Sequence, residues 1–217
     1  MELKVSPNSV LSEITRVLRE AIIKGHFKPG DRLIESELVQ TLKVSRPSLR
    51  EALRRLEAER LIDIVPNRGP IVPVMTWEYA EQIYHTRMLL EGEVAALAAR
   101  YATRADIDDL RVRLKDFQDA ASKNDAERQV SSTNEFYDVL MRAANNAVIM
   151  EILQGLNARI SFLRAKSMSR VGRANASAAE LAKILDAVAA GDDALARQMA
   201  VDHIAKACKA AAEVGAG

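Results

Sequence analysis

The sequence has little cysteine, few aromatic residues and no long apolar run, and each shortage excludes a class of protein. The single cysteine, Cys208, excludes an internal disulfide framework and a cysteine-rich metal cluster. Aromatic residues make up only 4% of the chain while alanine is abundant, which favours helix over sheet. No apolar run approaches the roughly 20 residues that span a bilayer, and the charged start of the chain predicts no secretory signal. We expect a soluble, cytoplasmic, mainly helical protein that has no membrane partner.

Proline is confined to the first third of the chain, which marks a domain boundary. All six prolines precede residue 75, and residues 76–217 contain none. A long proline-free stretch is typical of a helical bundle, because proline breaks helix interiors. We therefore predict one domain over residues 1–75 and a second over residues 76–217. The first carries 13 Lys and Arg against 10 Asp and Glu, and this net charge of +3 permits nucleic-acid binding without establishing it.

The pattern of the first domain predicts three helices followed by a β-hairpin. Ser45 is placed to cap the third helix, and Pro47 falls in its first turn, where the missing N–H costs little. The helices are expected over residues 9–24, over 35–42 and from 46 onward, with β-prone runs at 61–65 and 71–74 around a loop at 66–70. Three helices and a β-hairpin make a winged helix-turn-helix.

The sequence pattern of the second domain predicts an antiparallel bundle of about six helices. They are expected at residues 76–102, 104–122, 124–144, 147–168, 174–190 and 192–212. The first is the most regular, since its inward positions step alternately by four and three residues and place Arg87 inside an otherwise apolar stripe. The predicted fold class is mainly α.

Two parts of the chain resemble a known family. The run Val44-Ser45-Arg46-Pro47-Ser48-Leu49-Arg50-Glu51-Ala52-Leu53-Arg54-Arg55-Leu56-Glu57 is similar to the DNA-binding domain of GntR-family bacterial transcription regulators, and the loop at 66–70 resembles their wing. In the second domain, Arg87-Met88-Leu89-Leu90-Glu91 and residues 136–146 and 191–203 resemble the all-helical FCD effector domain of the FadR-type branch. The resemblance implies binding to double-stranded operator DNA, a small-molecule effector and a homodimer.

The third helix and the wing carry the expected DNA contacts. In a helix-turn-helix the second helix of the motif enters the major groove, where arginine can donate two hydrogen bonds to guanine. Arg46 and Arg50 begin this helix, although solvated surface charge is the alternative. A serine there can donate to phosphate, but for Ser45 helix capping is at least as good an explanation. The expected DNA-binding residues are Ser45, Arg46, Ser48, Arg50, Arg68 and Gly69.

The positions of the family's metal ligands have changed in this chain. Many FCD domains hold a divalent metal with one aspartate and three histidines. The matching positions here are Thr133, Tyr137, Leu181 and His203. A hydroxyl, a phenol and one imidazole suit a divalent metal poorly. We therefore expect no metal and no cofactor, with a metal-responsive regulator of the same family as the alternative.

Arg87 is the most suggestive residue of the second domain. A guanidinium on an apolar stripe needs a partner, because burying an unpaired charge is costly. The partner is either a carboxylate effector or an internal acid such as Glu91, and the sequence leaves both open. We assign Arg87, Thr133, Tyr137 and His203 to the effector site, with a satisfied core histidine as the alternative for His203.

No catalytic constellation stands out. The sequence contains neither a P-loop nor a dinucleotide fingerprint, so we assign no catalytic residue and expect no enzyme. We interpret the chain as a homodimeric repressor whose operator affinity is modulated by an organic acid bound in the helical domain. A non-specific architectural DNA binder, the other class considered, would need a more basic surface and would give a uniform footprint governed by salt.

Overall fold

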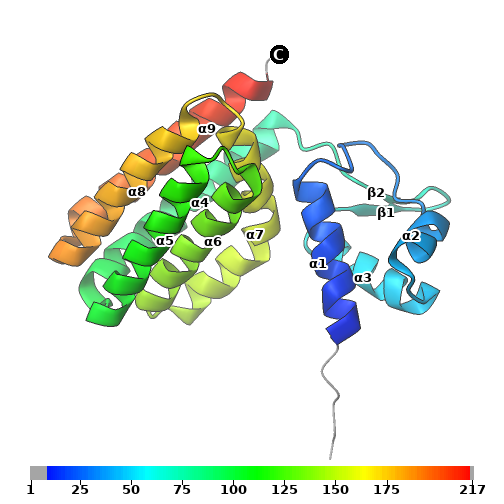
Figure 1. Cartoon of the computed structure of the whole chain (residues 1–217), viewed down its shortest axis with the longest axis horizontal. Coiled ribbons are helices and arrows are strands. Elements are labelled where there is room, and N and C mark those ends of the chain that lie inside the picture. Colours follow the sequence, from blue (N-terminus) through cyan, green and yellow to red (C-terminus); the bar gives the residue numbers. More distant parts are fainter. Residues whose placement is uncertain (1–8, 216–217) are drawn as a thin grey trace, which may run out of the picture. The chain divides into compact units, whose positions relative to one another are not determined.

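In the computed structural model, which describes residues 9–215, the chain divides into two compact units between Met75 and Thr76 (Figure 1). The first unit consists of α1 (Ser9–Ile23), α2 (Glu35–Leu42), α3 (Arg46–Ala58), β1 (Asp63–Val65) and β2 (Gly69–Ile71). The second consists of α4 (Trp77–Tyr101), α5 (Arg104–Ser122), α6 (Ala126–Ala143), α7 (Ala147–Met168), α8 (Arg173–Ala190) and α9 (Asp193–Gly215). The predicted class, a winged helix-turn-helix followed by a helical bundle, is confirmed.

The core of the first unit lies between α1 and α3. The buried face of α1 repeats every three or four residues, as in Ile14, Leu18 and Ile22, and it packs against α3, whose buried residues include Leu49 and Leu53. Burying each such side chain contributes roughly 1.5–3 kcal/mol relative to leaving it exposed. This packing fixes α3 at the surface with its opposite face turned to solvent.

Both strands of the hairpin are shorter than the sequence predicts: β1 begins two residues later, and β2 begins at Gly69, inside the loop expected at residues 66–70. Asp63 pairs with Ile71 and Val65 with Gly69 in an antiparallel register. The run predicted at 71–74 leaves the hairpin after Ile71 because Val72 pairs elsewhere: its N–H donates to the carbonyl of Asp31, and its own carbonyl accepts from Gly30. The wing is therefore anchored to the loop that precedes α2.

The second unit is a bundle in which α4 packs against four other helices, α6, α7, α8 and α9, while α5 packs on α6 and α8 (Figure 1). Four of these helices begin at a side chain that accepts a hydrogen bond from a backbone N–H of the first turn: Thr76, Thr103, Asp125 and Asn146. The predicted helix positions agree with these bounds to within three residues. No helix in the described part of the chain is long and apolar enough to cross a membrane.

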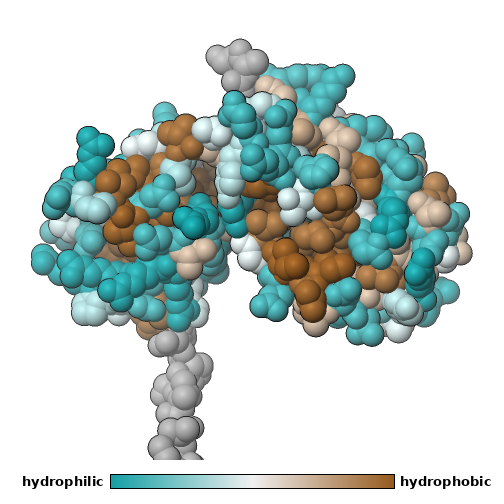
Figure 2. All heavy atoms as spheres, turned by 180° about the vertical axis from the view of Figure 1, so that it is seen from behind, coloured by the Kyte–Doolittle hydropathy of each residue, from teal (hydrophilic) through white to brown (hydrophobic). Residues whose placement is uncertain are grey.

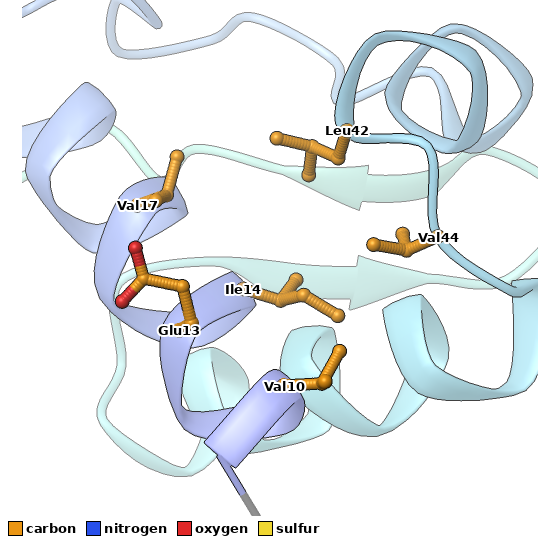
Figure 3. Close-up of a pocket in the computed structure, with 6 residues that line it drawn as sticks. All are labelled: Val10, Glu13, Ile14, Val17, Leu42 and Val44. Carbon is orange, nitrogen blue, oxygen red and sulfur yellow. The ribbon is translucent and has the colours of Figure 1, made fainter.

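An open apolar groove lies on the first unit beside α1 (Figure 3). Val10, Ile14 and Val17 on α1 lie opposite Leu42 and Val44, which flank the end of α2. Val10 is exposed, and Val17, Leu42 and Val44 are half-buried. The groove is separate from the solvent-facing arginines of α3.

Candidate DNA-binding and effector sites

The start of α3 is fixed by two serines, Ser45 and Ser48, which lie on either side of Pro47. The Ser45 hydroxyl oxygen accepts a hydrogen bond from the backbone N–H of Ser48 at 3.2 Å, and the two hydroxyl oxygens lie 2.8 Å apart. Ser45 is thus the N-cap of α3, which is the alternative that the sequence offered. A phosphate contact by either hydroxyl stays a prediction.

The two arginines at the start of α3 are both exposed but differ in their surroundings. Arg46 makes no ion pair or hydrogen bond with any residue that the structure describes. Arg50 donates from Nε to Glu35 Oε2 at 3.0 Å and is thereby tied to the first residue of α2. Further along the helix, Arg54 and Arg55 are also exposed. The solvent-facing side of α3 is therefore lined with guanidinium groups, as DNA binding requires.

The tip of the wing is a tight turn that requires a special backbone conformation. The N–H of Arg68 donates to the carbonyl of Val65 at 3.0 Å, and Asn67 and Gly69 both have positive φ angles, 62° and 80°. Glycine adopts such an angle without the strain that a side chain would bring. Arg68 is exposed at this tip, and the side chain of Arg32, which the sequence analysis did not select, lies next to Gly69. Contact of the wing with DNA stays a prediction.

The bundle contains a buried ion pair on α4. Arg87 Nε donates to Glu91 Oε1 at 2.7 Å, and Arg87 Nη2 lies 3.3 Å from Glu91 Oε2. Their side chains are only 1% and 2% exposed. Burial by itself would raise the pKa of Glu91, but the charges of Arg87 and Arg164 outweigh it and lower that pKa. The internal carboxylate, one of the two partners considered for Arg87, is therefore present.

A second buried arginine, Arg164 on α7, joins this pair. Its Nη2 lies 3.8 Å from Glu91 Oε2, and its Nη1 donates to the side-chain oxygen of Asn134. The guanidinium carbon lies 4.5 Å from the centre of the Tyr137 ring, an arrangement in which the ring face attracts the cation. Burial lowers the pKa of Arg164, although an arginine remains charged in a protein.

A third buried arginine, Arg173 at the start of α8, forms a separate group with Glu180 and His203. Arg173 Nη2 donates to Glu180 Oε2 at 2.8 Å, and His203 Nδ1 lies 2.7 Å from the same oxygen. Because burial lowers the pKa of His203, the ring is neutral at pH 7, and Nδ1 carries its proton since a carboxylate only accepts. His203 is thus a hydrogen-bonded core histidine, as the alternative interpretation held.

Three of the four predicted effector residues line one small pocket. Arg87, Thr133 and His203 surround, together with Arg164 and Arg173, a small cavity of about 10 Å³, which is roughly the room that one water molecule needs. Tyr137 instead lines a neighbouring cavity of about 20 Å³, which shares Arg164 with the first. The Thr133 hydroxyl is satisfied within its own helix by the carbonyl of Gln129 at 2.7 Å.

The charges around this pocket do not balance. The three guanidinium groups and Lys206, which pairs with Glu180, face three carboxylates, Glu91, Glu180 and Asp138, so the cluster carries one excess positive charge while His203 is neutral. Four buried nitrogen atoms of these arginines have no hydrogen-bond partner among the described residues: Arg87 Nη1, Arg164 Nε, and Arg173 Nε and Nη1. Leaving a buried donor unpaired is costly, so a cluster of this kind is suited to an anion that accepts hydrogen bonds.

The positions that hold a metal in many FCD domains do not fit one here. Leu181 is fully buried and offers no donor, and the Thr133 hydroxyl donates to its own helix. His203 supplies the one imidazole, and its Nδ1 is engaged by Glu180. Across residues 9–215 the structure contains no group of three or more His, Cys, Asp or Glu side chains placed to hold a metal ion. The donor chemistry therefore argues against a metal at these positions.

Sequence reasoning selected Arg87 but not Arg164 or Arg173. Arg164 lies on the buried side of α7 with Ile160 and Ser167, which are four residues before and three after it, so the argument used for Arg87 could have found it. Arg173 follows Gly172 at a helix start, and no periodic pattern distinguishes it from exposed arginines nearby.

Comparison with known proteins gives the same two-part division. Residues 11–72 match the family described as "Bacterial regulatory proteins, gntR family", and residues 82–206 match the FCD domain. The Nta operon transcriptional regulator of Aminobacter aminovorans is 34% identical over 139 residues, which span 64% of this chain and 66% of that protein. The transcriptional regulator YdhC of Bacillus subtilis (strain 168) is 26% identical over 193 residues, 88% of this chain and 86% of that one.

Solved structures share the whole fold. Escherichia coli McbR/YncC superposes with a TM-score of 0.83 at 23% identity, covering 97% of this chain and 99% of the other. A GntR transcriptional regulator from Rhodococcus sp. RHA1 superposes with a TM-score of 0.77 at 25% identity, with coverages of 97% and 99%.

Proposed function

Because the chain belongs to the gntR family of bacterial regulatory proteins and carries an FCD domain, we propose that it is a homodimeric repressor whose affinity for operator DNA is controlled by an organic anion. Regulators of this family bind operator DNA, and FCD domains bind small-molecule effectors. The relatives and structural neighbours are transcriptional regulators and not enzymes.

The DNA-binding surface of this proposal is α3 with the wing. The exposed guanidinium groups of Arg46 and Arg50 support entry of α3 into the major groove, where each can donate two hydrogen bonds to guanine. Ser45 and Ser48 lie at the helix start, close to where phosphate contacts occur in this motif. The positive φ of Gly69 supports a wing tip that presents Arg68 to the minor groove or the backbone.

The proposal includes a homodimer because of the two-fold symmetry that operators of this motif have. One winged helix reads one half-site, so recognition of a pseudo-palindrome needs a second copy related by two-fold symmetry. Figure 2 shows apolar surface gathered on one face of the helical unit. Exposed apolar side chains of this unit include Leu89, Val148 and Ile152. Apolar surface gathered as in Figure 2 supports an interface with another protein chain.

The unbalanced arginine cluster carries the effector proposal. A carboxylate bound beside Arg173 and Arg87 would neutralise the excess positive charge and accept hydrogen bonds from their unpaired nitrogen atoms. In this arrangement Thr133 and His203 line the anion site and Tyr137 lines the neighbouring one, and both cavities open when the effector binds, because each has room for only about one water molecule. The effector changes operator affinity only if it binds the DNA-bound and DNA-free arrangements of the dimer unequally.

A thermal-shift experiment tests the effector proposal. The full-length protein is heated with a panel of small organic acids and with the uncharged amide of each acid. An acid present at 100 times its Kd stabilises the folded state by about 2.7 kcal/mol, and the matching amide has no such effect. Arg173→Met should lose the response, whereas Arg170→Met, which removes an exposed arginine paired with Glu213, should keep it. Equal responses to acid and amide would contradict the proposal.

A further inference from the structure

The ion pair between Glu35 and Arg50 joins two elements of the DNA-binding unit that lie 15 residues apart in sequence. Glu35 is the first residue of α2, where its negative charge also suits the helix N-terminus. Arg50 lies in the second turn of α3, and its Nε donates to Glu35 Oε2 at 3.0 Å. The side chain of Arg50 is 66% exposed and that of Glu35 is 35% exposed, so the pair lies at the surface.

Stability does not explain this pair. An exposed ion pair contributes little to folding, because it is screened by water and salt and holds two long side chains in one geometry. Helices α2 and α3 are already in contact, and each buries apolar side chains such as Leu38 and Leu49. The consequence of the pair is therefore the orientation of a guanidinium group on the face of α3 that carries Arg46.

The geometry of the pair leaves part of Arg50 available for recognition. Because Glu35 engages Nε, the edge formed by Nη1 and Nη2 makes no hydrogen bond with a residue in the described part of the chain. Two parallel N–H donors on that edge match the O6 and N7 acceptors of guanine. An arginine that is already oriented loses less side-chain freedom when it binds.

The charge of Glu35 also weakens the complex with non-specific DNA. On non-specific DNA the contacts are to phosphate, and a carboxylate beside Arg50 both competes for its guanidinium and repels the backbone. On the correct base, Arg50 uses its free edge and keeps Glu35 as a partner. The pair therefore favours base contacts over phosphate contacts.

We propose that Glu35 is a positioning residue that determines sequence specificity by holding Arg50 for base recognition. This inference rests on the proposed function, namely that Arg50 contacts operator DNA. Glu35 itself touches no DNA, and it acts through Arg50.

The test compares Glu35→Gln with Glu37→Gln in the full-length protein. Both variants remove one acidic charge from the first turn of α2, but Glu37 is exposed and its side chain pairs with no residue for which the structure gives a position. Fluorescence anisotropy gives the affinity for two probes, a duplex selected by the protein from a random library and a scrambled duplex of the same composition. Circular dichroism confirms that each variant is folded.

Glu35→Gln should lower the ratio of specific to non-specific affinity by about threefold to tenfold, as expected when one long side chain loses its orientation. Glu37→Gln should raise both affinities equally and leave the ratio unchanged. In an Arg50→Ala background, Glu35→Gln should no longer change the ratio.

Two results would overturn the inference. One is a Glu35→Gln variant that behaves like Glu37→Gln, and the other is a fall in the ratio that persists in the Arg50→Ala background. Failure of the proposed function has a different signature, since Arg50→Ala alone would then bind the selected duplex with wild-type affinity.

Discussion

Replacing Arg87 by methionine tests how the buried ion pair of α4 is held. The substitution keeps most of the side-chain volume and removes the charge, so its main effect is to leave Glu91 buried without its nearest partner. Both side chains are almost completely inaccessible, and Glu91 then retains only Arg164, whose Nη2 is 3.8 Å away. The substitution is expected to destabilise the helical unit.

The size of the effect follows from the burial of the pair. Removing one partner of a buried ion pair typically costs 3–5 kcal/mol, because the remaining charge has lost its water and its counter-ion, so about 3–5 kcal/mol is expected here. Arg164 offsets part of that cost, which places the expectation near the lower end, about 3 kcal/mol. For a chain of this size, that loss lowers Tm by roughly 10 °C.

Thermal unfolding followed by circular dichroism measures the change, and two variants calibrate it. Arg104→Met breaks a pair of the same spacing, with Asp108 four residues on, but Arg104 is 82% exposed, so a loss of less than about 0.5 kcal/mol is expected. The double variant Arg87→Met with Glu91→Met should regain part of the lost stability, because no carboxylate is left buried without Arg87, although Arg164 then loses Glu91 as its partner.

This expectation is wrong if the free energy of unfolding of Arg87→Met lies within about 1 kcal/mol of the wild-type value. It also fails if the double variant is no more stable than the single one. Either result would show that Glu91 does not depend on Arg87.

Three further predictions concern DNA, pH and metal. Arg46→Ala and Arg50→Ala should each weaken operator binding by roughly 1–3 kcal/mol, whereas Arg68→Ala should weaken specific and non-specific binding alike; wild-type operator affinity in the first two would refute the docking of α3. Burial lowers the pKa of His203, so below about pH 6.5 the unfolded chain binds a proton more readily than the folded one, and stability, measured by denaturant titration, should fall as the pH falls. His203→Gln should remove this component. Elemental analysis should find substoichiometric metal, and EDTA should leave operator binding unchanged; one tightly held Zn²⁺, Ni²⁺ or Mn²⁺ per chain would favour the metal-responsive alternative.

Local patterns predicted the fold well because they depend on neighbours in sequence. The placement of Pro47 and the capping of α3 by Ser45 follow from residues within one turn of each other. The hairpin was less predictable, since Val72 hydrogen-bonds to the loop at residues 30–31, about 40 positions earlier. A pattern of β-prone residues contains no information about which distant backbone will pair with it.

The arginine cluster shows the same limit for the candidate site. The stripe on α4 identified Arg87 as a buried charge in need of a partner, and it gave Glu91 as one candidate. It could not show that Arg164 and Arg173 come to the same pocket, because α7 and α8 are brought there by the packing of the whole bundle. The excess of positive charge is a property of several helices together.

Coupling between the anion pocket and DNA is the most direct test of the account. Anisotropy of the labelled, library-selected duplex is measured with full-length protein, with and without a saturating acid identified by thermal shift. The wild-type affinity should fall by about tenfold or more, within the usual range for coupling between two sites. Arg173→Met, measured at a temperature at which circular dichroism shows it to be folded, should bind the duplex normally and show no change with the acid. A wild-type affinity that no stabilising acid alters, or one that the uncharged amide alters equally, would contradict the account.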